Sequence, residues 1–471
     1  MKTIIKNGTI VTDKASFKSD ILIEGEVISQ LAESISADDA RVIDASGKLV
    51  LPGGIDPHVH LHLEMMGTIS SDDYYSGGKA AAFGGTTTVI DFVSQGSGSL
   101  AESIETHRRF ADATTSIDYG SHMNISRFDD QVAEQIASLP ELGITTIKVF
   151  TAYNGRLRIT DGDVFKAMRV AGQNDILTMV HAENGDVIEV LVSEALEASY
   201  TQPIWHALTR PGWGAVEASL RAFSLAAQAD APVYLVHMNM AGEVDQLKYA
   251  RSKGIYAMGE TCPQYLFFTA ENLLHQDGSK FICSPPLRSE DDNAGLWHGL
   301  LDGTIQVLAT DHCPFFYNGQ VPINYEGQDI AIPGKELGKD DFTKIPNGLP
   351  GLGDRLPVFW TNAVAAGRIS AERFVALTST NPARIFGLYP QKGCLQPGSD
   401  ADIAIWDPDF RVKYGVAVAQ QRTDYNLYEG WDLKGMPVTV LQRGNILVDH
   451  GQWFGKPGQG KFLHRQSGEV L

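Results

Sequence analysis

Cysteine is scarce in this chain, and the spacing of its cysteines excludes two kinds of stabilised fold. The four cysteines, Cys262, Cys283, Cys313 and Cys394, lie far apart and form no C-x-x-C pair. This spacing argues against both a disulfide framework and a thiolate zinc site. We therefore expect all four to be small, buried, hydrophobic side chains.

Long apolar runs and an excess of basic charge are also absent. No apolar stretch reaches the roughly 18 residues that span a bilayer, and the first ten residues lack the apolar core of a secretory signal. Lys and Arg number 38 against 57 Asp and Glu, and the resulting net charge of −19 would repel a phosphate backbone. We expect a cytoplasmic protein that binds neither membranes nor nucleic acids.

The composition is that of a soluble globular protein. Hydrophobic residues make up 43% and charged residues 20% of the 471 residues, which argues against disorder and fibrous structure. This length accommodates one large barrel with additions, or two to three domains.

Short strand candidates separated by glycines occupy both ends of the chain, without a long helical pattern among the first fifty residues. They are residues 3–6, 9–12, 20–24, 27–31 and 42–44 near the start, and residues 402–406, 438–443 and 446–448 near the end. This pattern is compatible with one β unit built from the two ends.

Between the two ends, apolar strand-like runs alternate with helix-length segments, which is typical of a parallel α/β sheet or barrel. The eight strand candidates are residues 49–58, 86–92, 117–123, 145–150, 177–181, 233–237, 255–260 and 305–310. Eight units across about 340 residues fit a (β/α)8 TIM-like barrel with insertions better than an open sheet. We expect the barrel to comprise residues 51–390.

Residues 315–350 form a long expected loop after the eighth strand, rich in Gly, Pro, Asn and Asp. Loops at this end of a barrel strand contribute to active sites, so a lid is one interpretation. A surface insertion or an oligomer contact is an alternative of equal weight.

Candidate metal ligands fall at the C-terminal ends of the expected barrel strands, where barrel enzymes place their chemistry. They are His58, His60, Lys148, His181, His237 and Asp311. His58 and His60 are two residues apart, so in a strand both project to one side and can bind the same metal. Imidazole suits zinc, although an H-x-H pair alone is more often structural.

Lys148 is the unexpected member of this set, because a nearby divalent cation strongly disfavours its ammonium form. A neutral amine that captured carbon dioxide would become a carbamate anion able to bridge two metals. The carbamate, Asp311 and a bridging hydroxide would together offset three of the four positive charges of two divalent ions. The alternative is a lysine whose stem packs in the barrel while its ammonium pairs with an acid.

Over nearly its whole length the chain resembles the hydantoinase and dihydropyrimidinase family of cyclic amidohydrolases. The matching segments are PGGIDPHVH (52–60), GGTTT (84–88), KVFTAY (148–153), HAEN (181–184), ETCPQYL (260–266), SPPLR (284–288), TDHCPF (310–315), NGLPG (347–351) and PGSDAD (397–402). The resemblance implies a small β-sandwich domain from residues 1–50 and 391–471 beside the barrel.

The resemblance also implies roles for individual residues. One divalent metal, expected to be zinc, would be held by His58, His60, Lys148 and Asp311. The second would be held by N-carboxylated Lys148, His181 and His237. Tyr153 would stabilise the oxyanion, while Ser284 and Asn347 would contact the substrate's amide groups largely through their backbones.

The implied reaction is hydrolytic ring opening of 5-substituted hydantoins or dihydropyrimidines to N-carbamoyl amino acids, catalysed by a homotetramer. A hydroxide bridging the two metals would attack, and Asp311 would carry a proton to the leaving nitrogen.

An allantoinase, a dihydroorotase or a cyclic imidase is the nearest alternative. Dihydroorotases typically carry arginine where this chain has His62. A non-catalytic scaffold is disfavoured, because all six ligand positions are filled.

Overall fold

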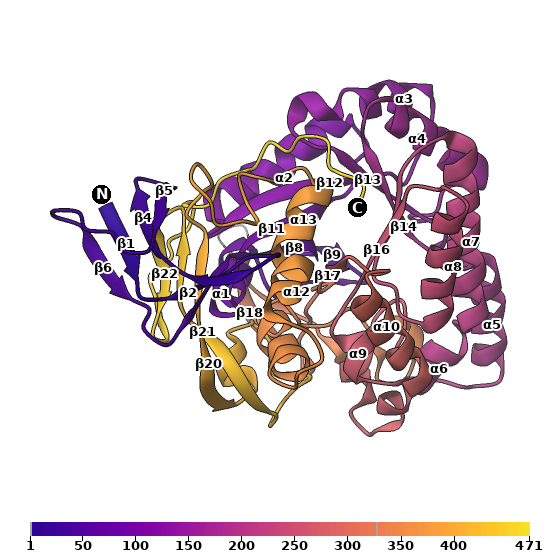
Figure 1. The fold of residues 1–471 in the computed structure, drawn as a ribbon. Coiled ribbons are helices and arrows are strands. Elements are labelled where there is room, and N and C mark those ends of the chain that lie inside the picture. Colours follow the sequence, from indigo (N-terminus) through magenta and orange to yellow (C-terminus); the bar gives the residue numbers. More distant parts are fainter. Residues whose placement is uncertain (1, 326–327) are drawn as a thin grey trace.

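An eight-stranded parallel sheet forms the centre of the molecule in a computed structural model that describes residues 2–325 and 328–471. Its strand order is β17-β16-β15-β14-β13-β12-β11-β8 (Figure 1). The strands are β8 (Gly54–Val59), β11 (Thr86–Val93), β12 (Asp118–Asn124), β13 (Thr146–Phe150), β14 (Leu177–His181), β15 (Val233–Leu235), β16 (Ala257–Thr261) and β17 (Val307–Leu308). Every residue of these strands is buried, as expected for a parallel sheet that is covered on both faces.

The two outer strands of this sheet, β8 and β17, are joined by contacts that close it into a barrel. Val59 at the end of β8 forms a parallel bridge with His312, and the His60 amide donates to the His312 carbonyl at 2.7 Å. The buried Arg355 guanidinium donates to the carbonyls of Ile55 in β8 and Leu308 in β17, at 2.7 and 2.9 Å. The predicted (β/α)8 barrel is confirmed.

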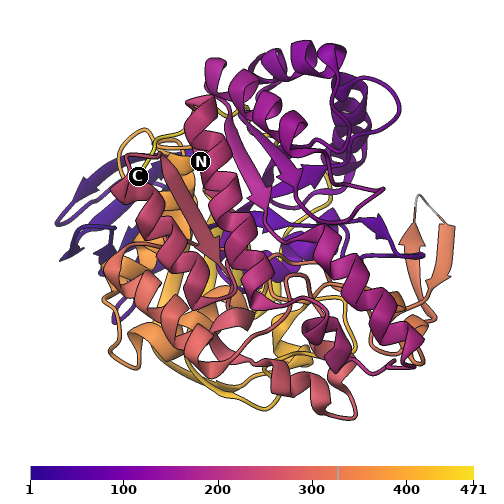
Figure 2. The same cartoon turned by 90° about the vertical axis from the view of Figure 1, so that its right-hand side faces the viewer.

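Helices cover the outside of the barrel (Figures 1 and 2). The eight long helices are α1 (Tyr74–Phe83), α2 (Leu100–Thr114), α3 (Asp130–Ala137), α4 (Asp161–Gln173), α5 (Gly185–Glu197), α7 (Gly212–Ala229), α8 (Ala241–Ser252) and α10 (Glu290–Asp302). The shorter helices are α6 (Ile204–Leu208), α9 (Gln264–Phe267), α11 (Arg355–Phe359), α12 (Ala371–Val375), α13 (Asn381–Ile385) and α14 (Val416–Ala419). Local sequence sets several helix starts: Ser99 and Glu102 form a capping box at the start of α2.

Two further sheets bring the chain ends together beside the barrel (Figure 1). The four-stranded sheet contains β1 (Lys2–Lys6), β4 (Asp20–Glu24), β5 (Val27–Ala32) and β6 (Arg41–Asp44). The seven-stranded sheet contains β2 (Thr9–Val11), β3 (Ser16–Lys18), β7 (Leu49–Pro52), β20 (Ile403–Lys413), β21 (Asp432–Gln442), β22 (Asn445–Asp449) and β23 (Gln452–Trp453). Ile5 and Ile21 of the first sheet share a buried cluster with Val50 and Ile405 of the second, so the two sheets enclose a common core.

The structure corrects three details of the predicted elements. The single strand expected at residues 49–58 is two strands, because β7 pairs with β20 in the seven-stranded sheet and only β8 enters the barrel. The short strand β3 was not predicted. The expected loop at residues 315–350 has structure of its own: a hairpin of β18 (Val321–Tyr325) and β19 (Gln328–Ile332), followed by the short 3-10 helices η4 (Lys335–Gly338) and η5 (Phe342–Lys344).

This hairpin projects from the edge of the molecule (Figure 2). At its base, Ile323 and Ile332 pack against Ile69 in the small hairpin of β9 (Glu64–Met65) and β10 (Thr68–Ile69). The Thr68 hydroxyl also donates to the Pro333 carbonyl at 2.5 Å. Residues 315–350 are therefore attached to the loop that follows the first barrel strand.

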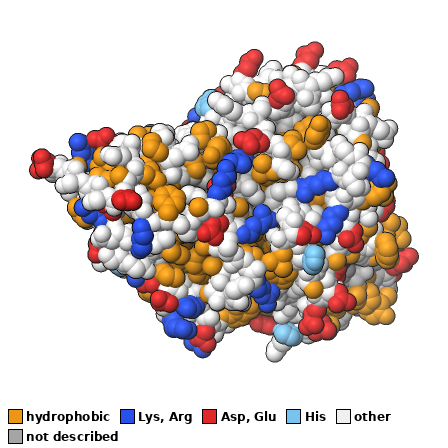
Figure 3. All heavy atoms as spheres, viewed as in Figure 1, with side chains coloured by type: hydrophobic (Ala, Val, Ile, Leu, Met, Phe, Trp, Pro, Cys, Tyr) orange, Lys and Arg blue, Asp and Glu red, His pale blue; other side chains and the backbone are white. Residues whose placement is uncertain are grey.

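The cysteines and the surface agree with most of the compositional expectations. Cys262, Cys283 and Cys313 are buried free thiols, whereas Cys394 is only partly buried. Acidic and basic side chains are interspersed over the face shown in Figure 3. Within the described part of the chain, no helix combines the length and apolar character needed to cross a membrane.

Candidate metal centre and active site

The six predicted metal ligands lie at one end of the barrel. His58 is in β8, and His60 directly follows that strand. Lys148 is in β13 and His181 ends β14. The other two, His237 and Asp311, lie two residues after β15 and three residues after β17, so they come from loops rather than from the strands themselves.

Three of these side chains converge around the Asp311 carboxylate. Its Oδ1 atom is 3.2 Å from His58 Nε2 and 3.1 Å from His60 Nε2. One donor atom from each residue lies within 4.8 Å of the others. Burial raises the pKa of Asp311, but the neighbouring His58 and His60 outweigh burial and hold it well below its usual range.

The buried Glu260 carboxylate orients His58. It contacts His58 Nδ1 and also accepts a hydrogen bond from the Tyr234 hydroxyl at 2.9 Å. A carboxylate only accepts, so Nδ1 carries a proton, and Nε2 is the ring atom directed at Asp311. Burial lowers the pKa of His58, but Glu260 and Asp311 outweigh burial and raise it above its usual value. A divalent metal that displaced the Nε2 proton would find two adjacent donors in Nε2 and the Asp311 carboxylate, so this donor set fits a metal ion.

His181 and His237 form the second part of the cluster. His181 Nε2 lies 2.8 Å from the Glu183 carboxylate, which leaves His181 Nδ1 facing His237 Nε2 at 2.9 Å. His237 Nδ1 is buried and has no partner among the described residues. The ring centroids of His237 and His58 are 5.3 Å apart, so the two parts are adjacent. This imidazole pair also fits a metal ion.

Lys148 reaches the cluster from β13. Its Nζ is 2.9 Å from His58 Nε2 and lies over the Phe92 and Phe150 rings, 4.1 and 5.3 Å from their centroids. No carboxylate of the described residues forms an ion pair with it. Burial lowers the pKa of Lys148 to about 8, although Asp311 opposes that shift. The alternative, in which the Lys148 ammonium pairs with an acid, therefore finds no such acid among the described residues.

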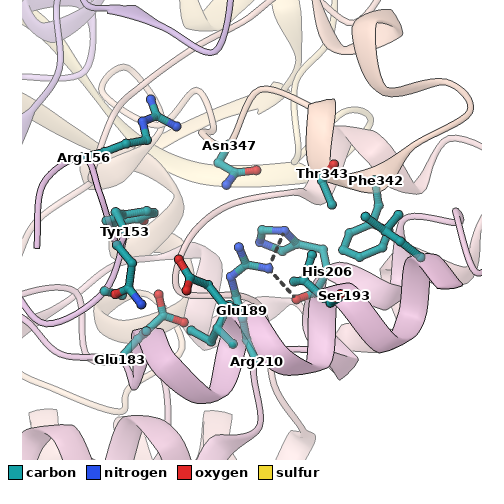
Figure 4. Close-up of a pocket in the computed structure, with 16 residues that line it drawn as sticks. Tyr153, Arg156, Glu183, Glu189, Ser193, His206, Arg210, Phe342, Thr343 and Asn347 are labelled. Carbon is teal, nitrogen blue, oxygen red and sulfur yellow. Dashed lines mark hydrogen bonds between the residues drawn. The ribbon is translucent and has the colours of Figure 1, made fainter.

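Of the three residues predicted to contact substrate, Tyr153 lies beside His181, and Ser284 and Asn347 lie at a neighbouring cavity. The Tyr153 and His181 ring centroids are 5.0 Å apart. Tyr153 and Asn347 line one cavity of about 430 Å³, whose wall includes α5 (Figure 4). Asn347 Nδ2 donates to Ser284 Oγ at 3.1 Å, which places Ser284 next to this cavity.

Three residues of the predicted site have a strained backbone. Tyr153, His237 and Asp311 have φ angles of 68°, 37° and 54°. Residues with side chains rarely adopt this left-handed region, and such residues tend to cluster at functional sites. The surrounding structure therefore holds these three side chains in positions that relaxed strand geometry does not provide.

Several polar residues around the site were not predicted from the sequence. Glu183 and Glu260 lie within the matched segments but received no role. The sequence did offer a signal for Glu260, because it is a carboxylate at the end of the seventh expected strand. His206 and Arg210, which line the cavity, and the buried Lys335 gave no such signal, because their contacts are with segments distant in the chain.

A second acidic cluster resembles a metal site but already contains a cationic side chain. Asp118, Asp400 and Asp402 have carboxylate oxygens within 4.8 Å of one another. The Lys392 ammonium lies among them, 2.6 to 3.0 Å from all three. This cluster joins the barrel to the C-terminal strands and is structural.

A closed parallel barrel with imidazole and carboxylate donors at the C-terminal ends of its strands defines the class of metal-dependent barrel hydrolases. The chain belongs to the amidohydrolase family, which it matches over residues 49–447.

Individual relatives match the chain almost from end to end. The D-hydantoinase of Geobacillus stearothermophilus is 42% identical over 469 residues, covering 99% of this chain and 97% of that protein. The D-hydantoinase of Streptomyces coelicolor is 40% identical over 478 residues, covering 100% and 99%. The crystal structure of dihydropyrimidinase from Brevibacillus agri NCHU1002 superposes with a TM-score of 0.95 at 42% identity and covers 100% of both chains.

Proposed function

We propose that this chain hydrolyses cyclic amides, opening 5-substituted hydantoins and dihydropyrimidines to N-carbamoyl amino acids. The observation that carries the proposal is the convergence of His58, His60 and Asp311 next to His181 and His237, beside a cavity lined by Tyr153. The names of the full-length relatives support this substrate class, and the D-hydantoinases among them support preference for the D enantiomer.

Two divalent metal ions, which we propose to be zinc, would occupy this cluster. The first would be bound by His58, His60, Lys148 and Asp311, and the second by Lys148, His181 and His237. Lys148 would be N-carboxylated and shared by both. The proximity of its Nζ to His58 and the lack of a carboxylate partner among the described residues support this assignment. When bound, the metals supply an acidified water molecule and polarise the carbonyl group.

The protein's own groups would position the substrate and move the proton. The backbone groups of Ser284 and Asn347 would hold the ring amide, so that the water oxygen attacks the carbonyl carbon. Tyr153 would donate its hydroxyl proton in a hydrogen bond to the resulting oxyanion. Asp311 would take the proton from water and deliver it to the amide nitrogen as the carbon–nitrogen bond breaks. The single ring-opened product, an N-carbamoyl amino acid, carries both the new carboxylate and the carbamoyl group.

The division into a barrel at residues 51–390 and a β-sandwich at residues 1–50 and 391–471 is part of the same proposal, with β7 extending the sandwich to Pro52. The family resemblance further supports a cytoplasmic homotetramer. Sedimentation of the purified protein tests the assembly: a mass near four chains is expected, and a stable monomer would contradict it.

A substrate panel tests the function directly. Zinc-loaded protein should open 5-substituted hydantoins and dihydrouracil faster than dihydroorotate, allantoin or cyclic imides. Chiral analysis of the products should show the D-N-carbamoyl amino acid. Turnover of dihydroorotate or allantoin alone would reject the proposal, and an excess of L product would reject its stereochemical part.

A further inference from the structure

Lys335 is a buried lysine in residues 315–350 that the proposed reaction does not use. It begins η4, and only 1% of its surface is exposed. Its Nζ donates to the Ile282 carbonyl at 3.1 Å and to the Pro346 carbonyl at 2.9 Å. Burial lowers the pKa of Lys335 to about 7. The neutral amine still has two N–H groups, which matches the two carbonyl acceptors.

The two carbonyls that Lys335 binds belong to the segments that carry Ser284 and Asn347. Ile282 lies two residues before Ser284, and Pro346 directly precedes Asn347. The same Ile282 carbonyl also accepts from the Gly348 amide at 3.1 Å. One side chain thus fixes the separation between two segments that are more than sixty residues apart.

His206 holds the next carbonyl of the first segment. Its Nε2 donates to the Cys283 carbonyl at 2.8 Å, while Arg210 donates to its Nδ1 at 3.1 Å (Figure 4). The Arg210 contact requires a lone pair on Nδ1 and therefore fixes the proton on Nε2. The carbonyls of residues 282 and 283 are therefore both bound by buried side chains.

The peptide groups that follow these anchored carbonyls remain available for a ligand. Within residues 2–325 and 328–471, no protein group hydrogen-bonds to the backbone N–H or C=O of Ser284 or Asn347. Asn347 Oδ1 is also buried without a partner. Buried or half-buried peptide groups are normally satisfied, so this cluster is arranged for a molecule with amide donors and acceptors.

We propose that Lys335 is a positioning residue that sets the spacing of the Ser284 and Asn347 peptide groups for the ring amide of the substrate. Residues 315–350 thus contribute a buried anchor for the binding site, a role separate from those of lid, surface insertion or oligomer contact. The inference rests on the proposed function only in taking the bound molecule to be a cyclic amide.

Lys335→Met tests the role, because methionine keeps most of the apolar stem and removes both donors. We expect KM for the best hydantoin to rise about tenfold or more, since two buried carbonyls lose a donor next to the binding groups. The kcat value and the metal content should change less than about threefold, because Lys335 touches no metal ligand.

Lys392→Met is the matched control, since Lys392 is equally buried but lies in the structural acidic cluster. It should lower thermal stability and leave KM unchanged. Lys335→Gln retains an N–H₂ group and should therefore recover part of the lost affinity. If Lys335→Met does not fold, the kinetic test can be made with Lys335→Gln. A Lys335 variant that loses stability at unchanged KM, as the control does, would overturn the positioning role.

Hydrogen exchange in the substrate-free protein separates this inference from the proposed function. Amides in residues 282–288 and 346–351 should exchange faster in Lys335→Met or Lys335→Gln than in wild type or Lys392→Met. Faster exchange in the Lys335 variants, found together with a wild-type protein that opens no cyclic amide, would reject the substrate class but retain the anchor. Unchanged exchange in both segments would reject the anchor, whatever the wild-type activity.

Discussion

The Glu260 carboxylate contacts Nδ1 of His58, and neither side chain is exposed to solvent. This contact holds the Nδ1 proton of His58 toward Glu260 and leaves Nε2 directed at Asp311. A carboxylate behind a metal-binding histidine also raises the basicity of that histidine. Strand β16 carries no predicted ligand, yet it contributes to the site through Glu260.

Glu260→Gln should weaken metal binding while leaving the barrel folded. Loss of such a partner typically costs about 10- to 100-fold in metal affinity. Titration of the metal-free protein with zinc in the presence of a competing chelator measures the change in zinc affinity. Tyr234→Phe, which removes the other side-chain contact of Glu260, should have a smaller effect. Equal zinc affinities for wild type and Glu260→Gln would show that the carboxylate does not tune this site.

Tyr153→Phe should reduce kcat by a factor on the order of 10²–10³, because it removes a proposed oxyanion donor. The φ of 68° should persist in the variant, since phenylalanine preserves the ring that packs near His181. Steady-state kinetics with dihydrouracil or a hydantoin measure the effect. A reduction below about fivefold would remove Tyr153 from the reaction.

Glu243 should make stability depend on pH. It is buried and accepts hydrogen bonds from the Asn239 amide at 2.7 Å and the Ser219 hydroxyl at 3.3 Å. Burial raises the pKa of Glu243 to about 7, so the folded state holds a proton that the unfolded chain releases at lower pH. The stabilising effect of this proton is full below about pH 4.5 and is lost as pH rises toward 7.

Glu243→Gln removes this titration. Relative to the variant, wild type should lose roughly 2–3 kcal/mol of unfolding free energy between pH 5 and pH 8. Urea denaturation of both proteins at the two pH values gives the difference. A constant difference would mean that Glu243 keeps an ordinary pKa in the folded protein.

The barrel could be predicted because its strands are short apolar runs separated by helix-length segments. The same signal failed at residues 49–58, where Leu49–Pro52 and Gly54–Val59 follow each other as one strand-like segment but enter different sheets. Pairing with β20, more than 350 residues away, decides that boundary, and no local pattern encodes it. The β18–β19 hairpin was missed because turn-forming residues dominate its surroundings.

The convergence of the proposed metal ligands could be predicted because the ends of parallel strands must meet at one rim of a barrel. His58 and His60 followed from their spacing, and Asp311 from its place after an apolar run. The orienting contacts of Glu260 and Lys335 could not be predicted, because each depends on side-chain packing between distant segments. The strained backbone at Tyr153 and His237 is likewise a product of tertiary structure.

Lys148 is the residue on which the proposed two-metal centre depends most. Metal-free wild type and Lys148→Ala can each be incubated with zinc, with and without bicarbonate, and analysed for metal content and hydantoin hydrolysis. Wild type should bind two zinc ions per chain and become active only when bicarbonate is present, because the carbamate supplies the shared anionic ligand.

Lys148→Ala should bind fewer than two zinc ions per chain and remain inactive under every condition. Two bound metals and wild-type activity in Lys148→Ala would contradict the proposed centre.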